Sequence, residues 1–228
     1  ATDALDTNGD SLGRRVCDSV QTNGFTYGTG HTGSNGSSAS DYVAWSFAKQ
    51  PKFFTIVEYT GNGVQGRTIS HDLGCTVGCI IVKRKDTNSA WPVYHRGLTS
   101  ALYGVQLNTT NDQFDADVNA SGGTYVAYLW AHNNNDGEFG SAGDQDIIKC
   151  GSFTTGSNGI ADVNLGFEPQ WILVRKVNET MNWEMFDMMR GWVHSTHIDN
   201  LDFMLRANLS NSEYSGFDSR GHPTATGF

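Results

Sequence analysis

Three side chains that can bind a metal ion follow one another at four-residue steps: His71, Cys75 and Cys79. Ligands with this spacing come together on a helix, and Gly74 and Gly78 disfavour a helix here. Structural zinc sites use cysteine pairs separated by two residues, a spacing that this segment does not have. We therefore predict that the thiols hold no metal and are mostly buried. The sequence leaves open the disulfide state of four cysteines: Cys17, Cys75, Cys79 and Cys150.

Two histidines, His71 and His95, are candidates for an acid–base pair, because imidazoles transfer protons near neutral pH. Both lie in segments that occur twice in the chain, and the second occurrence keeps the apolar residues but has neither histidine. Residues 162–166 lack a histidine, and Asp187 takes the place of His95. Polar residues that a duplication discards are expected to be structural. The chain also lacks the motifs of serine hydrolases, zinc proteases and P-loop proteins, so we predict that it is not an enzyme.

Two stretches rich in oxygen-bearing side chains are reminiscent of calcium loops. In residues 6–10 oxygen ligands alternate around a glycine, but Cys17 stands where such a loop needs an acid at its twelfth position. Residues 133–138, with Asp144 and Asp146 nearby, form the second stretch. Asn, Asp and Gly are also the residues that tight turns require. We expect solvated turns at both places, with no metal and no cofactor.

The segments that carry these side chains recur along the chain, which is typical of an internal repeat. The matched segments are 41–48 with 124–131, at an offset of 83, and 80–84 with 172–176 and 91–94 with 183–186, both at an offset of 92. The offset grows because residues 132–152 are about eleven residues longer than their counterpart, residues 49–58. Insertions between matched apolar segments are loops.

Each repeat is predicted to consist mostly of strands, because its apolar segments are short, β-branched and aromatic, and end at Gly or Asn. The predicted strands are 42–47, 53–59, 79–83 and 91–94 in the first repeat, and 125–130, 147–153, 171–175 and 183–186 in the second. Residues 185–192 are the best candidate for a helix. The predicted fold class is all-β, with two tandem antiparallel β-sandwich or jelly-roll-like units.

The predicted domain organisation is an N-terminal lead-in and partial unit over residues 1–40, a first β-sandwich repeat over 41–123 and a second over 124–228. The second repeat ends without the Tyr-Val-Ala strand that should follow residues 226–228. We expect either that the N-terminal region supplies this strand or that the polypeptide continues beyond residue 228. Since an unpaired strand edge must be covered, we also expect a homo-oligomer.

The order of four motifs, residues 60–63, 69–74, 80–83 and 91–95, resembles a repeat domain of unknown function found in virion proteins of marine tailed bacteriophages. Many of those proteins are tail-fibre-like. The resemblance covers roughly residues 41–131 well, whereas residues 132–228 drift from the pattern. It implies a structural protein of the virion, assembled in the host cytoplasm, whose partners are other virion proteins. Because that family has no established catalytic residues, the resemblance implies none here.

The amino-acid composition also limits the classes of molecule that this protein is expected to bind. The chain has 228 residues, with 15 Lys and Arg against 24 Asp and Glu, so its net charge is −9. This charge disfavours nucleic acid and anionic lipid as partners. No run of about 18 apolar residues exists, so we predict no membrane insertion. Charged residues make up only 17% of the chain, so its surface must consist largely of neutral groups that suit a host-surface polysaccharide.

We therefore expect a non-enzymatic virion protein, in a tail fibre or attachment appendage, that adheres to the host surface. The alternatives are a capsid decoration protein with the same fold, and a glycan depolymerase, which would need two carboxylates in a groove. Contact candidates come from the long second-repeat loop and from aromatic residues outside the repeated segments: Asn133, Asn134, Asn135, Glu138, Tyr103, Trp192 and Tyr214.

Overall fold

Strands make up nearly all of the regular structure in the computed structural model, which describes residues 17–27, 43–98, 104–107, 118–193, 203–209, 211–214 and 221–228. These ranges contain ten strands, one 3-10 turn and no α-helix, which confirms the all-β prediction. None of their elements is a helix with the length and apolar character needed to cross a bilayer. The chain divides into two compact units, Ala1–Phe47 and Ala48–Phe228.

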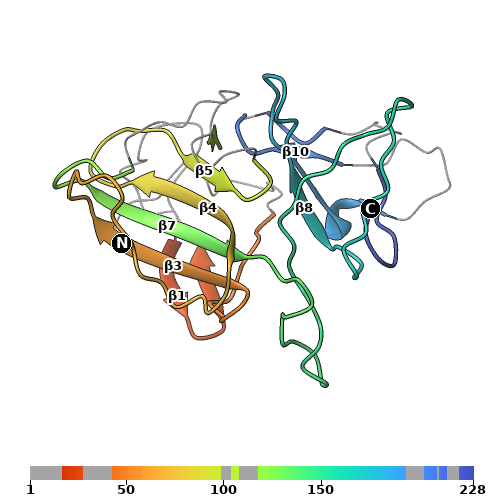
Figure 1. Ribbon diagram of the computed structural model, residues 1–228, viewed down its shortest axis with the longest axis horizontal. Helices are drawn as coiled ribbons and strands as arrows, with labels where there is room; N and C mark the ends of the chain where they lie inside the picture. The colour runs from red at the N-terminus through yellow and green to blue at the C-terminus, as the bar shows by residue number, and fades with distance from the viewer. Residues whose placement is uncertain are drawn as a thin grey trace. The chain divides into compact units, whose positions relative to one another are not determined.

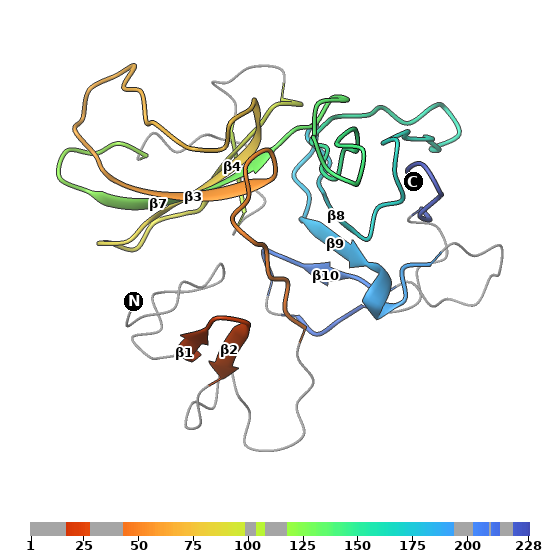
Figure 2. The ribbon, with the colours of Figure 1, turned by 90° about the horizontal axis from the view of Figure 1, so that it is seen from below.

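The first unit contains one antiparallel hairpin, formed by β1 (Cys17–Gln21) and β2 (Gly24–Tyr27) (Figure 2). The repeat pattern of the sequence did not predict this hairpin. In contrast, residues 43–47 contain no strand, although the repeat pattern predicted one over residues 42–47. Position 42 lies outside the described residues.

The second unit contains a five-stranded antiparallel sheet with the order β3-β7-β4-β5-β6 (Figure 1). Its strands are β3 (Phe54–Thr60), β4 (Val77–Arg84), β5 (Pro92–His95), β6 (Val105–Gln106) and β7 (Thr124–Ala131). β7 is an internal strand of this sheet, because it pairs with β3 along nearly its whole length on one side and with β4 on the other. A strand predicted to open the second repeat therefore completes a sheet otherwise built from the first repeat. The predicted domain boundaries stay predictions.

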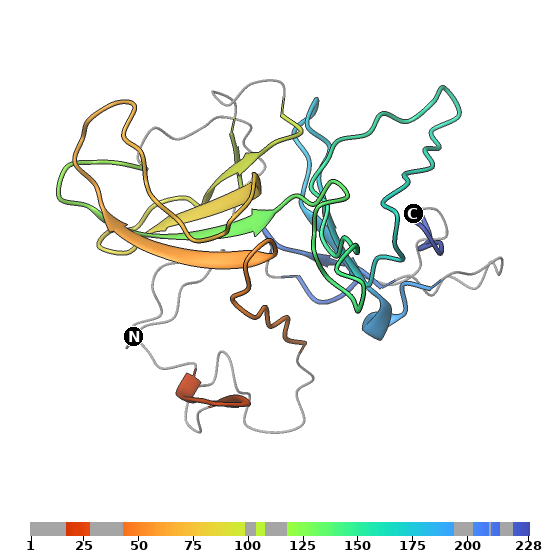
Figure 3. The same cartoon turned by 60° about the horizontal axis from the view of Figure 1, so that its bottom comes forward.

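β7 also supplies most of the buried cluster on one face of this sheet. Ala127, Leu129 and Ala131 pack with Leu73, and all four are buried. Leu73 belongs to the connection between β3 and β4, which arches over the sheet (Figure 3). The small alanines let this connection approach the sheet closely. The core of the second unit thus depends on a strand that is distant in sequence from its neighbours.

A three-stranded antiparallel sheet, with the order β8-β9-β10, lies in the C-terminal part of the second unit (Figure 2). Its strands are β8 (Trp171–Val174), β9 (Glu184–Asp187) and β10 (Leu205–Arg206). The candidate helix over residues 185–192 does not form as an α-helix. Its first residues belong to β9, and Asp187, the last residue of that strand, is extended. Only the 3-10 turn η1 (Met188–Arg190) follows it.

The pairing of β8 with β9 repeats that of β4 with β5, shifted by 92 residues in both strands. Ile80 lies opposite Tyr94, and Ile172 lies opposite Phe186. One step beyond each ladder the same hydrogen bond recurs. Arg96 N–H donates to the Gly78 carbonyl at 2.9 Å, and Met188 N–H donates to the Gln170 carbonyl at 3.0 Å. The two hairpins therefore share strand order, direction and register.

Side-chain contacts recur at the same offset. The Lys83 ammonium lies 5.6 Å from the ring centre of Trp91, and the Arg175 guanidinium lies 5.6 Å from that of Trp183. A cation over an indole face is favourable, and more so where water is excluded. Both tryptophans are buried. The repeated segments thus keep a polar contact as well as their apolar pattern.

The two sheets of the second unit are joined at the main-chain oxygen of Gln106, the last residue of β6. It accepts a hydrogen bond from Trp183 Nε1 at 2.8 Å and one from an Arg175 guanidinium nitrogen at 3.3 Å. The strand predicted over residues 147–153 is not formed, and residues 151–160 are exposed. Its counterpart, β3, pairs with β7, whereas the described three-stranded sheet has no strand equivalent to β7.

Candidate functional site

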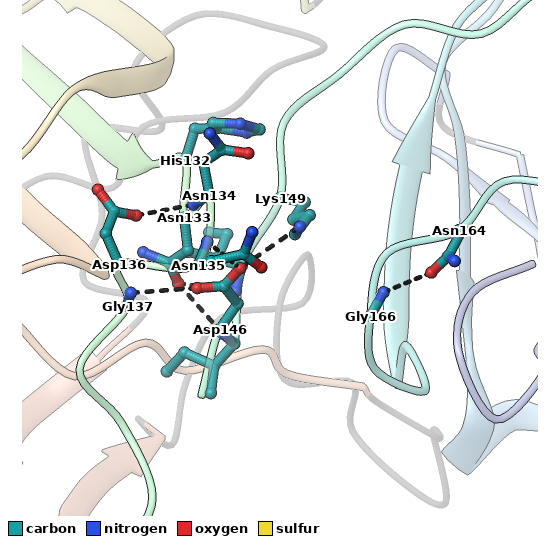
Figure 4. Close-up of polar contacts among 12 residues, drawn as sticks. His132, Asn133, Asn134, Asn135, Asp136, Gly137, Asp146, Lys149, Asn164 and Gly166 are labelled. Carbon is teal, nitrogen blue, oxygen red and sulfur yellow. Dashed lines mark hydrogen bonds and ion pairs between the residues drawn. The ribbon is translucent and has the colours of Figure 1, made fainter. Parts of the chain in front are cut away.

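The loop over residues 132–149, which follows β7, is the candidate site, and Asn133 fixes its base (Figure 4). The Asn133 side chain donates to the Lys52 carbonyl at 2.9 Å. Its amide oxygen accepts from Ile147 N–H at 3.1 Å and Ile148 N–H at 3.3 Å. Asn133 is only 1% exposed, so it has no surface to offer a receptor. The prediction that Asn133 makes a receptor contact is therefore wrong, because this amide is buried and its hydrogen bonds go to main-chain groups of the loop and of Lys52.

Asp146 holds the two halves of the loop together (Figure 4). Its carboxylate accepts from Asn135 N–H at 2.8 Å and from Gly137 N–H at 3.1 Å, and Lys149 Nζ lies 3.4 Å away. Burial acts to raise the pKa of this carboxyl, but the two N–H donors and the ammonium outweigh it, so the pKa lies below its ordinary value. Both oxygens are thus occupied by donors. The described residues contain no group of side chains arranged to hold a metal ion.

Three residues around this loop have positive φ angles that are uncommon outside glycine: Lys52 at 59°, Asn135 at 64° and Glu138 at 61°. They are joined by contacts. Lys52 forms an ion pair with Glu138 and donates to the Asp136 carbonyl at 3.2 Å. The hydrogen bond that Lys52 donates to the Glu138 carboxylate raises the pKa of the Lys52 ammonium. Such backbone conformations persist only where surrounding contacts impose them, so the loop has one defined shape.

The loop presents exposed polar side chains on this fixed frame. Asn134 and Asn135 are exposed, and Asn134 N–H donates to the Asp136 carboxylate at 2.7 Å. The side-chain amides of Asn134 and Asn135 make no hydrogen bond within the described part of the chain. Glu138 is also exposed, although Lys52 compensates its charge. The arrangement offers neutral donors and acceptors to a partner, and it brings together no nucleophile and base.

The aromatic contact candidates are placed differently. Trp192 is fully buried, donates through Nε1 to the Gly221 carbonyl at 3.0 Å and packs with Phe186. It is a core residue, so its prediction as a contact residue is wrong. Tyr214 is half-buried, with the Arg206 guanidinium 4.4 Å from its ring centre. Tyr103 lies outside the described residues.

The two histidines serve local turns. His71 Nδ1 accepts from Leu73 N–H at 3.3 Å, and His95 Nδ1 accepts from Gly97 N–H at 3.1 Å. Burial lowers the pKa of His95, and the charge of Arg96 adds to this effect. Asp187, the counterpart of His95, accepts from Arg190 N–H at 3.0 Å. The position therefore supplies an acceptor for the following turn in both repeats.

A family model matches residues 1–228. The chain belongs to the family described as Domain of unknown function (DUF7483). No curated protein and no solved structure matches it. The family description names no activity, so the function of this DUF7483 protein has to be argued from its own residues.

Three cysteines of the DUF7483 chain are free thiols: Cys75, Cys79 and Cys150. Burial raises the pKa of Cys150 to about 12. Burial also raises the pKa of Cys79, and the neighbouring Cys150 adds to that shift. Since the thiolate is the reactive form, burial makes these two side chains weak nucleophiles.

An apolar cavity of about 360 Å³ lies on one face of the five-stranded sheet of the DUF7483 chain. Strands β3, β7, β4 and β5 line it, together with the connection that carries Ile69 and His71. Tyr59, also in the lining, donates its hydroxyl to the Val118 carbonyl at 2.7 Å, and burial raises its pKa to about 12. The lining is mostly apolar, so the cavity suits an apolar group better than a polar substrate.

Proposed function

We propose that this protein is a non-enzymatic structural protein of a phage virion, located in a tail fibre or attachment appendage, that adheres to host-surface polysaccharide. In this proposal the two sheets belong to two tandem β-sandwich-like units, which form a rigid support. The 132–149 loop is the contact surface. The observation that carries this proposal is a loop whose acidic groups hold its own shape, while Asn134 and Asn135 stay exposed.

The chemistry of that surface supports a hydroxylated ligand. Amide side chains both donate and accept hydrogen bonds, which suits sugar hydroxyls. One such contact contributes only about 0.5–1.5 kcal/mol net, so a single site binds weakly. Many copies on one particle convert weak contacts into strong adhesion. The low charged fraction of the chain, 17%, fits this mode of binding better than an ionic one.

A loop variant tests the contact surface. Asn134→Ala together with Asn135→Gly removes both amides, and glycine tolerates the positive φ at position 135. Adsorption of the particle to host cells, or binding of the purified protein to immobilised host polysaccharide, is expected to fall about tenfold or more. The matched control, Asn178→Ala, removes an exposed amide elsewhere and should leave adsorption unchanged. Equal adsorption by all three proteins would contradict the proposal.

The position of the protein on the particle tests the assignment to an appendage. Antibody labelling followed by electron microscopy should mark fibres or tail tips. Labelling spread over the capsid shell would instead favour the decoration protein. Shortening of the polysaccharide on incubation with purified protein would favour the depolymerase. Either of these two results overturns the proposed function.

A further inference from the structure

The outer edge of β8 has main-chain groups available for pairing. Gln170 and Met188 form a hydrogen-bonded pair. Because such pairs alternate along an antiparallel ladder, the main-chain N–H and C=O groups of Ile172 and Val174 point toward β9. Leu173 therefore directs its N–H and C=O to the opposite side. These two groups have no hydrogen-bond partner in the described part of the chain, where β8 pairs only with β9. The β8 edge is thus open at its centre.

The equivalent edge of the five-stranded sheet is covered. By the 92-residue offset, β8 corresponds to residues 79–82 of β4. The edge of β4 away from β5 pairs with β7, which places Ile81 opposite Tyr128 and Val82 opposite Ala127. β7 is the strand whose sequence, Tyr-Val-Ala, occurs a second time at positions 42–44. Within the described residues, this edge is therefore paired with a strand in β4 and unpaired in β8.

We propose that residues 43–47 of a second molecule add to β8 as an antiparallel strand, in the way that β7 adds to β4. Such strand addition supplies main-chain hydrogen bonds together with side-chain pockets on alternate positions. In this chain the observed donor strand, β7, comes from the repeat that follows the acceptor sheet. For β8, in an assembly of identical molecules, the following repeat is the first repeat of the next molecule.

The repeat offsets fix the register of the proposed pairing. β7 residues correspond to residues 83 positions earlier, and β4 residues to residues 92 positions later. Applied to the pair Val82 and Ala127, these shifts place Val174 opposite Ala44. They also place Leu173 opposite Trp45. Since Val174 faces β9 with its own N–H, its pair with Ala44 is of the non-hydrogen-bonded type, in which side chains lie closest.

Burial agrees with a missing strand. Leu73 is fully buried against β7, whereas its counterpart Leu165 is only partly buried. Tyr59 stacks on Tyr125 of β7 with ring centres 5.0 Å apart. Phe153, which ends the predicted strand 147–153 as Tyr59 ends its counterpart 53–59, is 44% exposed, although its ring contacts that of Phe228. The proposed donor itself begins with an exposed apolar residue, Val43.

Disulfide trapping in a mixture of two full-length variants tests the proposal. One protein carries Ala44→Cys, and the other carries Val174→Cys and a tag that changes its size. Opposite residues in a non-hydrogen-bonded pair have Cα atoms about 4.5 Å apart, which a disulfide can bridge. Mild oxidation should yield a covalent dimer of one tagged and one untagged chain. Leu173→Cys, whose side chain points to the other face, replaces Val174→Cys in the control and should yield several-fold less.

Each outcome decides between the proposal and an alternative. A several-fold excess of the mixed dimer over the control supports addition between molecules. Equal yields from both mixtures would refute the proposed register. If a single chain carrying both Ala44→Cys and Val174→Cys oxidises only to a monomeric product at every protein concentration, the strand is supplied within one chain, and the proposal is overturned. The result does not depend on the 132–149 loop, so it is separate from the test of adhesion.

Discussion

Single polar residues in this protein hold the backbone in defined turns. Asp146 accepts two main-chain N–H groups of the loop, and Asn164 accepts Gly166 N–H at 2.9 Å (Figure 4). His71 and His95 do the same for the residues two positions ahead. These side chains are of types that the sequence alone could assign to metal binding or catalysis. Their hydrogen bonds assign them to the scaffold instead.

Replacing Asn133 should destabilise the protein more than replacing its neighbour. Asn133→Ala removes a buried side chain and leaves the partly buried N–H groups of Ile147 and Ile148 without their acceptor. An unsatisfied buried polar group costs roughly 1–3 kcal/mol, so with partial burial we expect a loss of about 1–3 kcal/mol in the free energy of unfolding. Urea unfolding monitored by tryptophan fluorescence measures this loss. The control Asn134→Ala should change stability by about 0.5 kcal/mol or less, and an equal effect of both would contradict the assignment.

The lowered pKa of His95 predicts a loss of stability on acidification. In the folded protein burial disfavours the protonated imidazole, whereas in the unfolded chain it takes up a proton near its ordinary pKa of 6.5. Stability should therefore fall as the pH drops below about 6.5, because the unfolded state binds more protons. In His95→Asn the side chain can still accept Gly97 N–H, as Asn164 does for Gly166, but it does not titrate.

Unfolding midpoints at several pH values between 7.5 and 5 check this. Stability should fall less steeply with decreasing pH in the His95→Asn protein than in the native chain. The difference in slope should correspond to at most one proton taken up on unfolding. Two parallel curves would show that His95 does not control the acid sensitivity.

At the scale of residues, the sequence could predict which side chains are polar and lie in loops, but not which of them are buried. Asn133 and Asn134 are adjacent and chemically identical. Only the fold places the first against Lys52 and the second in solvent. Trp192 was misassigned for the same reason, since its burial depends on Phe186 and Met204.

At the scale of elements, six of the eight predicted strands formed, within a few residues of their predicted ends. The two that did not, residues 42–47 and 147–153, have the same β-branched and aromatic character as the others. A strand is stable only with a partner, and partners are distant in sequence. Residues 147–153 correspond to β3, which pairs with β7, and the described three-stranded sheet contains no equivalent of that strand. Propensity predicted the segments, and pairing decided which became strands.

Two glycines at equivalent positions before β4 and β8 should lose similar amounts of stability when they are replaced. Gly74 and Gly166 have φ angles of 72° and 82°, and a Cβ atom at either position would meet nothing within 4 Å. Substitution by alanine should therefore cost only the left-handed backbone conformation, about 1–2 kcal/mol in each case. Gly151→Ala is the control, since Gly151 is equally uncrowded and has no positive φ.

Thermal or urea unfolding of the three variants measures these costs. A large loss for Gly74→Ala with none for Gly166→Ala would argue against equivalent turns in the two repeats.

At the scale of the whole molecule, the duplication explains why the chain is expected to associate. One sheet contains a strand from the other repeat, whereas the edge of β8 has no partner strand within the described residues. Edges of this kind pair with other chains unless they are blocked. A donor at one end and an acceptor at the other give a head-to-tail contact, which closes into rings or propagates as a filament. Such an assembly would present the 132–149 loop in many copies, as multivalent adhesion requires.

Proline at the centre of β8 should separate folding from assembly. Leu173 directs its N–H away from β9, so Leu173→Pro removes no hydrogen bond of the β8–β9 ladder, and proline is tolerated at such edge positions. It does remove the N–H that an added strand would use. We expect the variant to keep the far-ultraviolet circular dichroism of the native protein but to sediment as a monomer at concentrations where the native chain associates.

Proline also removes the leucine side chain, so two control variants are needed to separate this loss from the loss of the N–H group. Leu173→Ala loses the side chain and keeps the N–H, so it should still associate, although more weakly. Ile172→Pro removes an N–H that faces β9, so it should unfold the three-stranded sheet as well as prevent assembly. If Leu173→Pro associates as strongly as Leu173→Ala, the contact between molecules does not run through the main chain of β8, and another surface must join them.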